Sequence, residues 1–219
     1  MSSFVVHSIP GSPYGRAVLA TLMEKNAGFQ FVAVAPRTMK SEPHLCMHPF
    51  GRVPVLEHDG FRLYETQAIL RYLDRVLPTP ALTPADPRGA ARMDQLLGIC
   101  DWYLFQGVGN VIGFHRIVAP RLLGRAPDEA AVAAALPRAH VVMAELSQLL
   151  GGNAYLTGAQ MSLADIAIAA HMDFLAQTPE WEPLTVERVN LPAWLARVAA
   201  RKSLQATTWE RVAAMARAA

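Results

Sequence analysis

Residues 4–25 read FVVHSIPGSPYGRAVLATLMEK, and their hydrophobic pattern changes in the middle. The run FVVHSI at 4–9 is short and rich in β-branched and aromatic side chains, which favours a strand. The segment 16–25 instead repeats its apolar residues at helical spacing, which predicts a helix. Ser12 lies at the joint, and Pro13 follows it where the first turn of a helix accepts proline. The stretch therefore predicts a strand, a serine-containing turn and a helix.

The residues that follow extend this unit into a small α/β domain. FQFVAV at 29–34 predicts a second strand. VPVLEHDGFRLYE at 53–65 predicts a hairpin, because Asp59-Gly60 separates two apolar runs. TQAILRYLDRVL at 66–77 returns to the helical period. We therefore expect a domain of βαβ-ββα order over residues 1–77.

A proline-rich segment separates this domain from a helical one. Residues 78–89 read PTPALTPADPRG, and four prolines in so short a stretch predict a linker. Helical patterns fill residues 90–219, so we expect an all-α domain there, although Pro137 is expected to kink or interrupt one helix. Ser162 and Asp165 are spaced as a capping box at the start of another helix, which is a structural role.

Composition narrows the classes of function. The 219-residue chain has a formal charge of +2 and no basic stripe, which argues against nucleic-acid binding. The two cysteines, Cys46 and Cys100, have no metal-site spacing and fit a reducing compartment. We expect no signal peptide and no membrane span, and hence a cytoplasmic protein. The low share of charged residues, 17%, suggests surface that is covered by a second subunit.

Three roles are conceivable for Ser12. A nucleophilic role lacks support, because Ser12 is not in a G-x-S-x-G elbow and no pattern places a histidine beside it. A helix cap fits the local sequence, since serine is a preferred N-cap residue. The third role, a hydroxyl offered to a bound ligand, depends on the groups that surround it.

Two other segments supply groups that a peptide-like ligand would use. RVPVL at 52–56 places Pro54 at the first residue of a strand, where a cis bond and an unpaired backbone edge are expected. Such an edge can pair with a ligand's backbone. YETQAI at 64–69 places Glu65 and Thr66 at the mouth of a helix, where backbone N–H groups favour a carboxylate and Glu65 can meet an amine.

This combination resembles the cytosolic glutathione transferases, and within them the serine-type phi class of plants and related bacterial classes. SPYG at 12–15 sits where glutaredoxins carry C-P-Y-C. HPFGRVPVLEHDGFRLYETQAILRYL at 48–73 resembles the family's N-P-F-G-Q-V-P-x-L … D-G … L-x-E-S-x-A-I-x-x-Y-L signature. YLTGAQMSLADIAIAA at 155–170 resembles the second-domain signature Y-L-x-G-x-x-x-S-x-A-D. The resemblance implies a thioredoxin-like α/β N-terminal domain followed by an all-α C-terminal domain.

The resemblance also implies an activity. Glutathione would be the co-substrate, with no metal, and Ser12 would stabilise its thiolate for attack on a small hydrophobic electrophile. Phe50 would insert into the partner subunit of a homodimer. An apolar electrophile pocket between the domains is expected to include Ile9, Tyr14 and Phe114. The positions implied to bind glutathione are Lys40, Arg52, Val53, Pro54, Glu65 and Thr66.

Three positions depart from the family pattern. Arg52 stands where glutamine is usual, Gln67 follows the Glu-Thr pair where arginine is common, and Met39 replaces a histidine found in some phi-type members. Arg52 is itself able to hold a carboxylate, so we expect glutathione binding to survive with an altered affinity.

Two other functions remain open. Glutathione-dependent peroxide or disulfide reduction, dehalogenation and isomerisation use the same thiolate on the same fold. Ser12 in place of a cysteine argues against deglutathionylation through a mixed disulfide with the protein. A non-catalytic glutathione- or hydrophobe-binding protein is the second alternative, and the joint presence of Ser12, Pro54, Glu65 and Thr66 argues against it.

Overall fold

The computed structural model describes residues 3–218, and the chain divides into two compact units. The first unit comprises the residues up to Leu82 together with those from Ala200 onward, and the second comprises Thr83–Ala199. The sequence placed residues 90–219 in one helical domain, whereas the C-terminal segment groups with the first unit in the structure. The reason is a set of polar anchors: Arg16 donates to the Leu204 carbonyl at 3.0 Å, and Arg201 pairs with Glu24.

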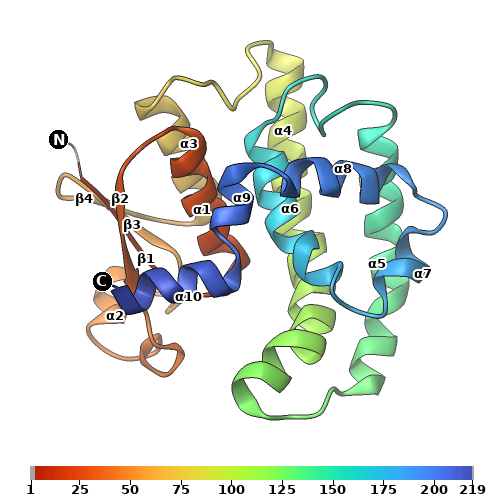
Figure 1. Ribbon diagram of the computed structural model, residues 1–219, viewed down its shortest axis with the longest axis horizontal. Coiled ribbons are helices and arrows are strands. Elements are labelled where there is room, and N and C mark those ends of the chain that lie inside the picture. The colour runs from red at the N-terminus through yellow and green to blue at the C-terminus, as the bar shows by residue number, and fades with distance from the viewer. Residues whose placement is uncertain (1–2, 219) are drawn as a thin grey trace. The chain divides into compact units, whose positions relative to one another are not determined.

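The first unit is built on a four-stranded mixed sheet in the order β2-β1-β3-β4 (Figure 1). Its strands are β1 (Phe4–Ser8), β2 (Phe29–Ala33), β3 (Val55–His58) and β4 (Phe61–Tyr64). β1 is parallel to β2 and antiparallel to β3, and β3 and β4 form a hairpin. Asp59 and Gly60 form its turn with φ of 49° and 82°, as their sequence predicted.

Helices cover the sheet. The helical segments of the first unit are α1 (Pro13–Glu24), η1 (Pro36–Thr38), α2 (His44–Met47), α3 (Thr66–Val76), α9 (Lys202–Ala206) and α10 (Trp209–Ala218). α1 packs on β1 and α3, and α3 packs on β4. Their buried leucines and isoleucine, which include Leu19, Leu22, Ile69 and Leu73, form a core with Val6 and Leu56 of the sheet. α9 packs against α1 and α10 against β2.

A buried ion pair ties the end of the sheet domain to the linker. Lys25 Nζ pairs with the Asp74 carboxylate and also donates to the Pro80 carbonyl, while the Leu82 N–H donates to Asp74 at 2.9 Å. Residues 77–86 contain no helix, but Pro87 already begins the next one, ahead of the boundary we expected at 90. Proline is tolerated there because the first helical position needs no N–H partner.

The second unit is helical. Its segments are α4 (Pro87–Ile99), the π-helical η2 (Cys100–Leu123), α5 (Glu129–Leu150), α6 (Leu163–Leu175), α7 (Trp181–Thr185) and α8 (Asn190–Ala199). α6 is buried along nearly its whole length and contacts α4, η2 and α8, so it forms the centre of this unit. Among residues 3–218, no helix is both long enough and apolar enough to cross a membrane.

Pro137 does not interrupt its helix, which was one of the two outcomes we expected. α5 runs through it from Glu129 to Leu150. Proline removes the hydrogen bond to the carbonyl four residues earlier, which here belongs to Ala133. Both residues lie on the exposed side of α5, so water can replace the lost partner.

The predicted capping box at the start of α6 is confirmed, and it extends further than the motif. Asp165 Oδ2 accepts from the N–H and the hydroxyl of Ser162, both at 2.8 Å. Its Oδ1 accepts from the Leu156 N–H and from Trp194 Nε1, also at 2.8 Å. One buried carboxylate thus joins the preceding loop, α6 and α8, and its role is structural.

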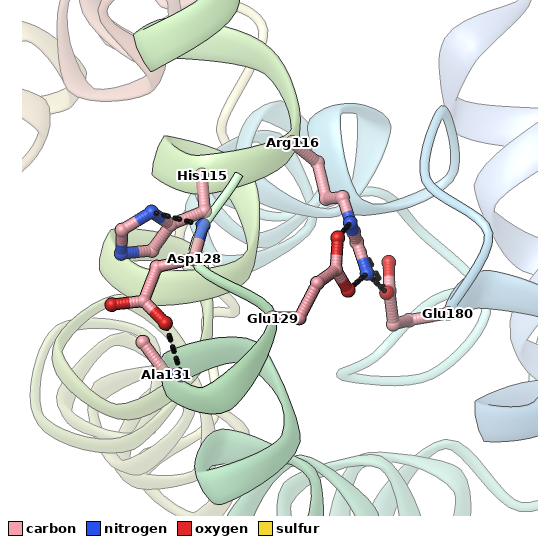
Figure 2. A network of polar contacts seen from close by, with 6 residues as sticks. All are labelled: His115, Arg116, Asp128, Glu129, Ala131 and Glu180. Atoms are coloured by element: carbon pink, nitrogen blue, oxygen red, sulfur yellow. Dashed lines mark hydrogen bonds and ion pairs between the residues drawn. The ribbon is translucent and has the colours of Figure 1, made fainter. Parts of the chain in front are cut away.

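A second polar network joins three elements of the same unit, and nothing in the sequence pattern pointed to it. Figure 2 shows the Arg116 guanidinium of η2 between two carboxylates, Glu129 at the start of α5 and Glu180 before α7. Its nearest approaches are 2.5 Å to Glu129 and 2.6 Å to Glu180. Alongside, the Asp128 N–H donates to His115 Nδ1 at 3.3 Å, and the Asp128 side chain caps α5. The two carboxylates raise the pKa of Arg116.

Candidate functional site

Ser12 is the N-cap of α1, as its local sequence predicted. Its Oγ accepts a hydrogen bond from the Gly15 N–H at 3.1 Å. A serine hydroxyl has one proton to donate beside its two lone pairs, and the cap uses it only as an acceptor. Capping and donation to a ligand are therefore compatible roles for the same oxygen.

The turn before the helix determines where this hydroxyl lies. The Ser12 N–H donates to the Ile9 carbonyl at 3.0 Å, which closes a four-residue β-turn. Pro10 occupies its second position and Gly11, with φ of 89°, its third, as in a type II turn. Gly15 then lets α1 approach the sheet, since a Cβ there would lie 2.1 Å from the Ser8 hydroxyl.

The Val53-Pro54 peptide bond is cis, as expected. β3 begins one residue later, and its ladder pairs His7 with Val55. Extending this antiparallel register places Val53 opposite Ile9. Within residues 3–218, the main chain of Val53 has no hydrogen-bond partner, so its N–H and carbonyl remain available to a ligand.

Glu65 and Thr66 join β4 to α3. Glu65 has φ of 71° and ψ of 111°, a conformation that is strained for a non-glycine residue and that is typical of functional sites. Thr66 is the first residue of the helix and is buried. The N–H groups at this helix end are the kind that receive a carboxylate. The Glu65 side chain makes no cap with them, so it does not compete for that position.

The sheet register brings these three segments to one edge. β3 pairs Val55 with Tyr64, so the continued register sets Glu65 opposite Pro54 and Thr66 opposite Val53. The turn that leads to Ser12 leaves β1 at the same end. A hydroxyl, an unpaired backbone edge and a helix mouth with an acidic side chain therefore lie at the ends of neighbouring strands.

The loop before Pro54 carries two exposed cations. Lys40 Nζ donates to the Phe50 carbonyl at 2.7 Å, and its Cδ would be 2.8 Å from a Cβ placed on Gly51. The Arg52 side chain is exposed. Lys40 thus packs on the backbone of Phe50 and Gly51, next to Arg52. Both side chains are exposed and available to an anionic group.

Two buried histidines, whose roles sequence reasoning missed, support this loop. His44 Nε2 lies 2.8 Å from the Arg52 carbonyl and so fixes the residue that precedes Val53. The His48 ring packs on Tyr64 with centroids 4.6 Å apart. Burial lowers the pKa of His48, as do the neighbouring charges, so His48 is held in its neutral form. No sequence pattern distinguishes His44, at the start of α2, or His48, just after it, from other histidines, so neither role was predicted.

The remaining predicted residues are Phe50, Ile9, Tyr14 and Phe114, and they differ in burial. Phe50 is 61% exposed and meets His48 edge to face. Ile9 and Tyr14 are half-buried on either side of Ser12 in the first unit. Phe114 is half-buried in the second unit, on η2. Their proposed roles at a dimer interface and in an electrophile pocket stay predictions.

Neither cysteine has the features of a reactive thiol. The Glu42 carboxylate accepts from the exposed Cys46 at 2.6 Å and raises the pKa of that thiol. Burial raises the pKa of Cys100. Over the described residues 3–218, no three His, Cys, Asp or Glu side chains are grouped as metal ligands.

Comparisons with known proteins show the family to which the chain is related. The N-terminal domain family of glutathione S-transferases matches residues 6–81, and the corresponding C-terminal domain family matches residues 111–202. A glutathione S-transferase from Hyoscyamus muticus is 30% identical over 90% of this chain and 93% of its own. The solved structure of glutathione S-transferase III in its apo form has a TM-score of 0.83 at 29% identity and covers 97% of both chains. The structure of glutathione S-transferase I bound with lactoylglutathione has a TM-score of 0.82 at 25% identity and covers 97% of this chain and 99% of its own.

Proposed function

The chain belongs to the glutathione transferase family and is an enzyme of it, and from this premise we propose that Ser12 activates the glutathione thiol for attack on small hydrophobic electrophiles. The observation that carries the proposal is the position of Ser12. Its hydroxyl caps α1 as an acceptor and keeps its proton for a ligand at the helix mouth.

The chemistry required of the site is the stabilisation of a thiolate. A free glutathione thiol has a pKa near the ordinary cysteine value of about 8.5, so little thiolate exists at neutral pH. A hydroxyl that donates to the sulfur favours the charged form, and the N-terminal end of α1 adds partial positive charge. Thiols at helix N-termini reach pKa values of roughly 3.5–7.5. Ser12 acts as a donor in this scheme and needs no general base.

The rest of the edge has groups to hold the tripeptide. The free N–H and carbonyl of Val53 suit the backbone of the cysteinyl residue. Glu65 suits the γ-glutamyl amine, and the α3 N-terminus with Thr66 suits the carboxylate beside it. Lys40 and Arg52 are the candidates for binding the glycine carboxylate. In this role Arg52 would replace the glutamine that is usual at its position.

An apolar pocket for the electrophile completes the proposal, with Ile9, Tyr14 and Phe114 as its candidate lining. We further propose that the enzyme works in a reducing cytoplasm as a homodimer that Phe50 helps to hold. Glutathione-dependent peroxide reduction or isomerisation would use the same thiolate. The absence of a cysteine at position 12 disfavours reactions that need a mixed disulfide with the protein.

The test is the ultraviolet absorbance of the thiolate as pH is raised, with glutathione bound to the wild-type protein, to Ser12→Ala and to Ser12→Thr. We expect a bound thiol pKa well below the free value in the wild type. Ser12→Ala should return it toward the free value and lower kcat roughly 10²- to 10³-fold, the usual cost of removing one such donor. Ser12→Thr keeps both the hydroxyl and the cap, so it should retain most of the shift.

Two results would reject this mechanism. Glutathione that binds to the wild type with an unshifted thiol would identify a carrier rather than a transferase. If the pKa of the bound thiol stays lowered in Ser12→Ala, another group activates the thiol, and Tyr14 is the next candidate. Loss of the cap in Ser12→Ala costs about 1 kcal/mol of stability, so the circular dichroism of each variant is compared first.

A further inference from the structure

The C-terminal segment returns to the unit that carries Ser12. α9 is anchored on α1 through the hydrogen bond from Arg16 to the Leu204 carbonyl at 3.0 Å. Arg201 and Ser203 both donate to the Glu24 carboxylate at the end of α1. α10 then runs beside β2 (Figure 1). The C-terminal segment is thus held against α1 and the sheet of its own unit.

Trp209, the first residue of α10, contacts the turn from Ile9 to Ser12. A Cβ placed on Gly11 would lie 2.5 Å from Cδ2 of Trp209 and 2.7 Å from Cε2 and Cε3. Real Cβ atoms do not come so close to an aromatic ring, so the fused bond of the half-buried indole lies directly on the backbone of Gly11. Gly11 immediately precedes Ser12 in the chain.

Trp209 therefore contacts Gly11, the residue whose φ determines the conformation of the turn. The type II turn from Ile9 to Ser12 requires a positive φ at Gly11, and glycine changes its φ more easily than any other residue. Rotation at Gly11 would move the N–H and the hydroxyl of Ser12 together. The indole occupies the space on one side of Gly11 and so opposes such a movement.

We propose that Trp209 is a positioning residue for thiol activation: it holds Gly11, and through it the Ser12 hydroxyl, in the geometry that stabilises the thiolate. The proposal rests on the function proposed above for Ser12. It makes the C-terminal helix a part of the catalytic apparatus, although Trp209 is separated from Ser12 by most of the chain. Errors in placement of about 1 Å can cost 10²-fold in rate, so such support has measurable consequences.

The experiment compares Trp209→Ala, Trp209→Phe and Val212→Ala with the wild type and with Ser12→Ala. Val212 is a buried residue of the same helix, so its truncation loosens α10 without removing the indole. Three quantities are measured: the pKa of the bound glutathione thiol, KM for glutathione, and kcat with chlorodinitrobenzene as the electrophile.

We expect Trp209→Ala to raise the bound thiol pKa and to lower kcat on the order of tenfold to a hundredfold. KM for glutathione should change less than about twofold, because Lys40, Val53 and Glu65 are untouched. Trp209→Phe keeps an aromatic ring on Gly11 and should restore most of the activity. Val212→Ala should leave the thiol pKa as in the wild type. If Trp209→Ala does not fold, Trp209→Leu takes its place.

The proposal is overturned if the Trp209 variants keep the wild-type thiol pKa while Ser12→Ala loses it. It is also overturned if Val212→Ala shifts the pKa as much as Trp209→Ala does, since the effect would then belong to α10 as a whole. A wild-type pKa in Ser12→Ala itself would instead reject the function proposed for the serine, so the two failures are distinguishable.

Discussion

The Asp165→Asn substitution tests how strongly one buried carboxylate holds the second unit together. Asp165 accepts four hydrogen bonds, two at each oxygen, from Leu156, Trp194 and Ser162. Asparagine keeps the shape but presents an NH2 group to two of those donors. Hydrogen bonds to a charged group contribute about 1.5–3 kcal/mol each, so two lost bonds amount to roughly 3–6 kcal/mol.

The free-energy cost of burying the Asp165 charge reduces the loss of stability that we expect from the substitution. Burial raises the pKa of the Asp165 carboxyl, against the four donors that lower it, and the neutral amide avoids that cost of burying a charge. We therefore expect a net loss of about 3 kcal/mol, a large share of the 5–15 kcal/mol typical of a folded protein. The reasoning applies to stability alone, since Asp165 lies in a structural motif.

Urea unfolding followed by circular dichroism measures the change, with Asp128→Ala as the matched control. Asp128 caps α5 through one hydrogen bond, to the Ala131 N–H at 3.0 Å, and it is exposed. Its removal should cost about 1 kcal/mol. If Asp165→Asn unfolds at the urea concentration of the wild type, or costs no more than Asp128→Ala, the four-bond account of this site is wrong.

Two further predictions concern pH and assembly. Burial lowers the pKa of His171 to about 4, so the unfolded chain takes up its proton first, and stability is lost as pH falls from about 6.5 toward 4. This amounts to about 2 kcal/mol at pH 5; urea midpoints at pH 7 and pH 5 should show it in the wild type, and a slope that persists in His171→Leu would assign it elsewhere. Phe50→Ala should convert the proposed homodimer into monomers in sedimentation experiments, and a dimer of unchanged affinity would show that Phe50 packs within its own subunit.

Much of the first unit is predictable because its signals are local. The hairpin at Asp59-Gly60 and the cap at Ser12 depend on residues within a few positions of one another. The same holds for the box at Ser162 and Asp165. Hydrogen bonds of this range form wherever the sequence allows them, and so the pattern of residues is sufficient to find them.

Other features depend on packing and on contacts between segments, which a short stretch of sequence does not reveal. Pro137 reads as a helix breaker, but the exposure of that side of α5, set by packing, lets the helix continue. His44, at the start of α2, supports Arg52 only because the chain after this helix turns back toward it. The strained backbone of Glu65 is likewise held by its surroundings, since an isolated chain would relax to a more favourable φ.

The sequence by itself determined the α/β unit, the helical unit and the three segments that form the candidate glutathione site, because strand and helix periods and turn residues act at short range. The tertiary structure alone decided that the chain's last residues belong with its first. The bond from Arg16 to Leu204 spans 188 residues, and the contact of Trp209 with Gly11 is comparably distant in sequence. Side chains so far apart leave no periodic trace, and they meet only when the burial of apolar surface has brought the chain ends together.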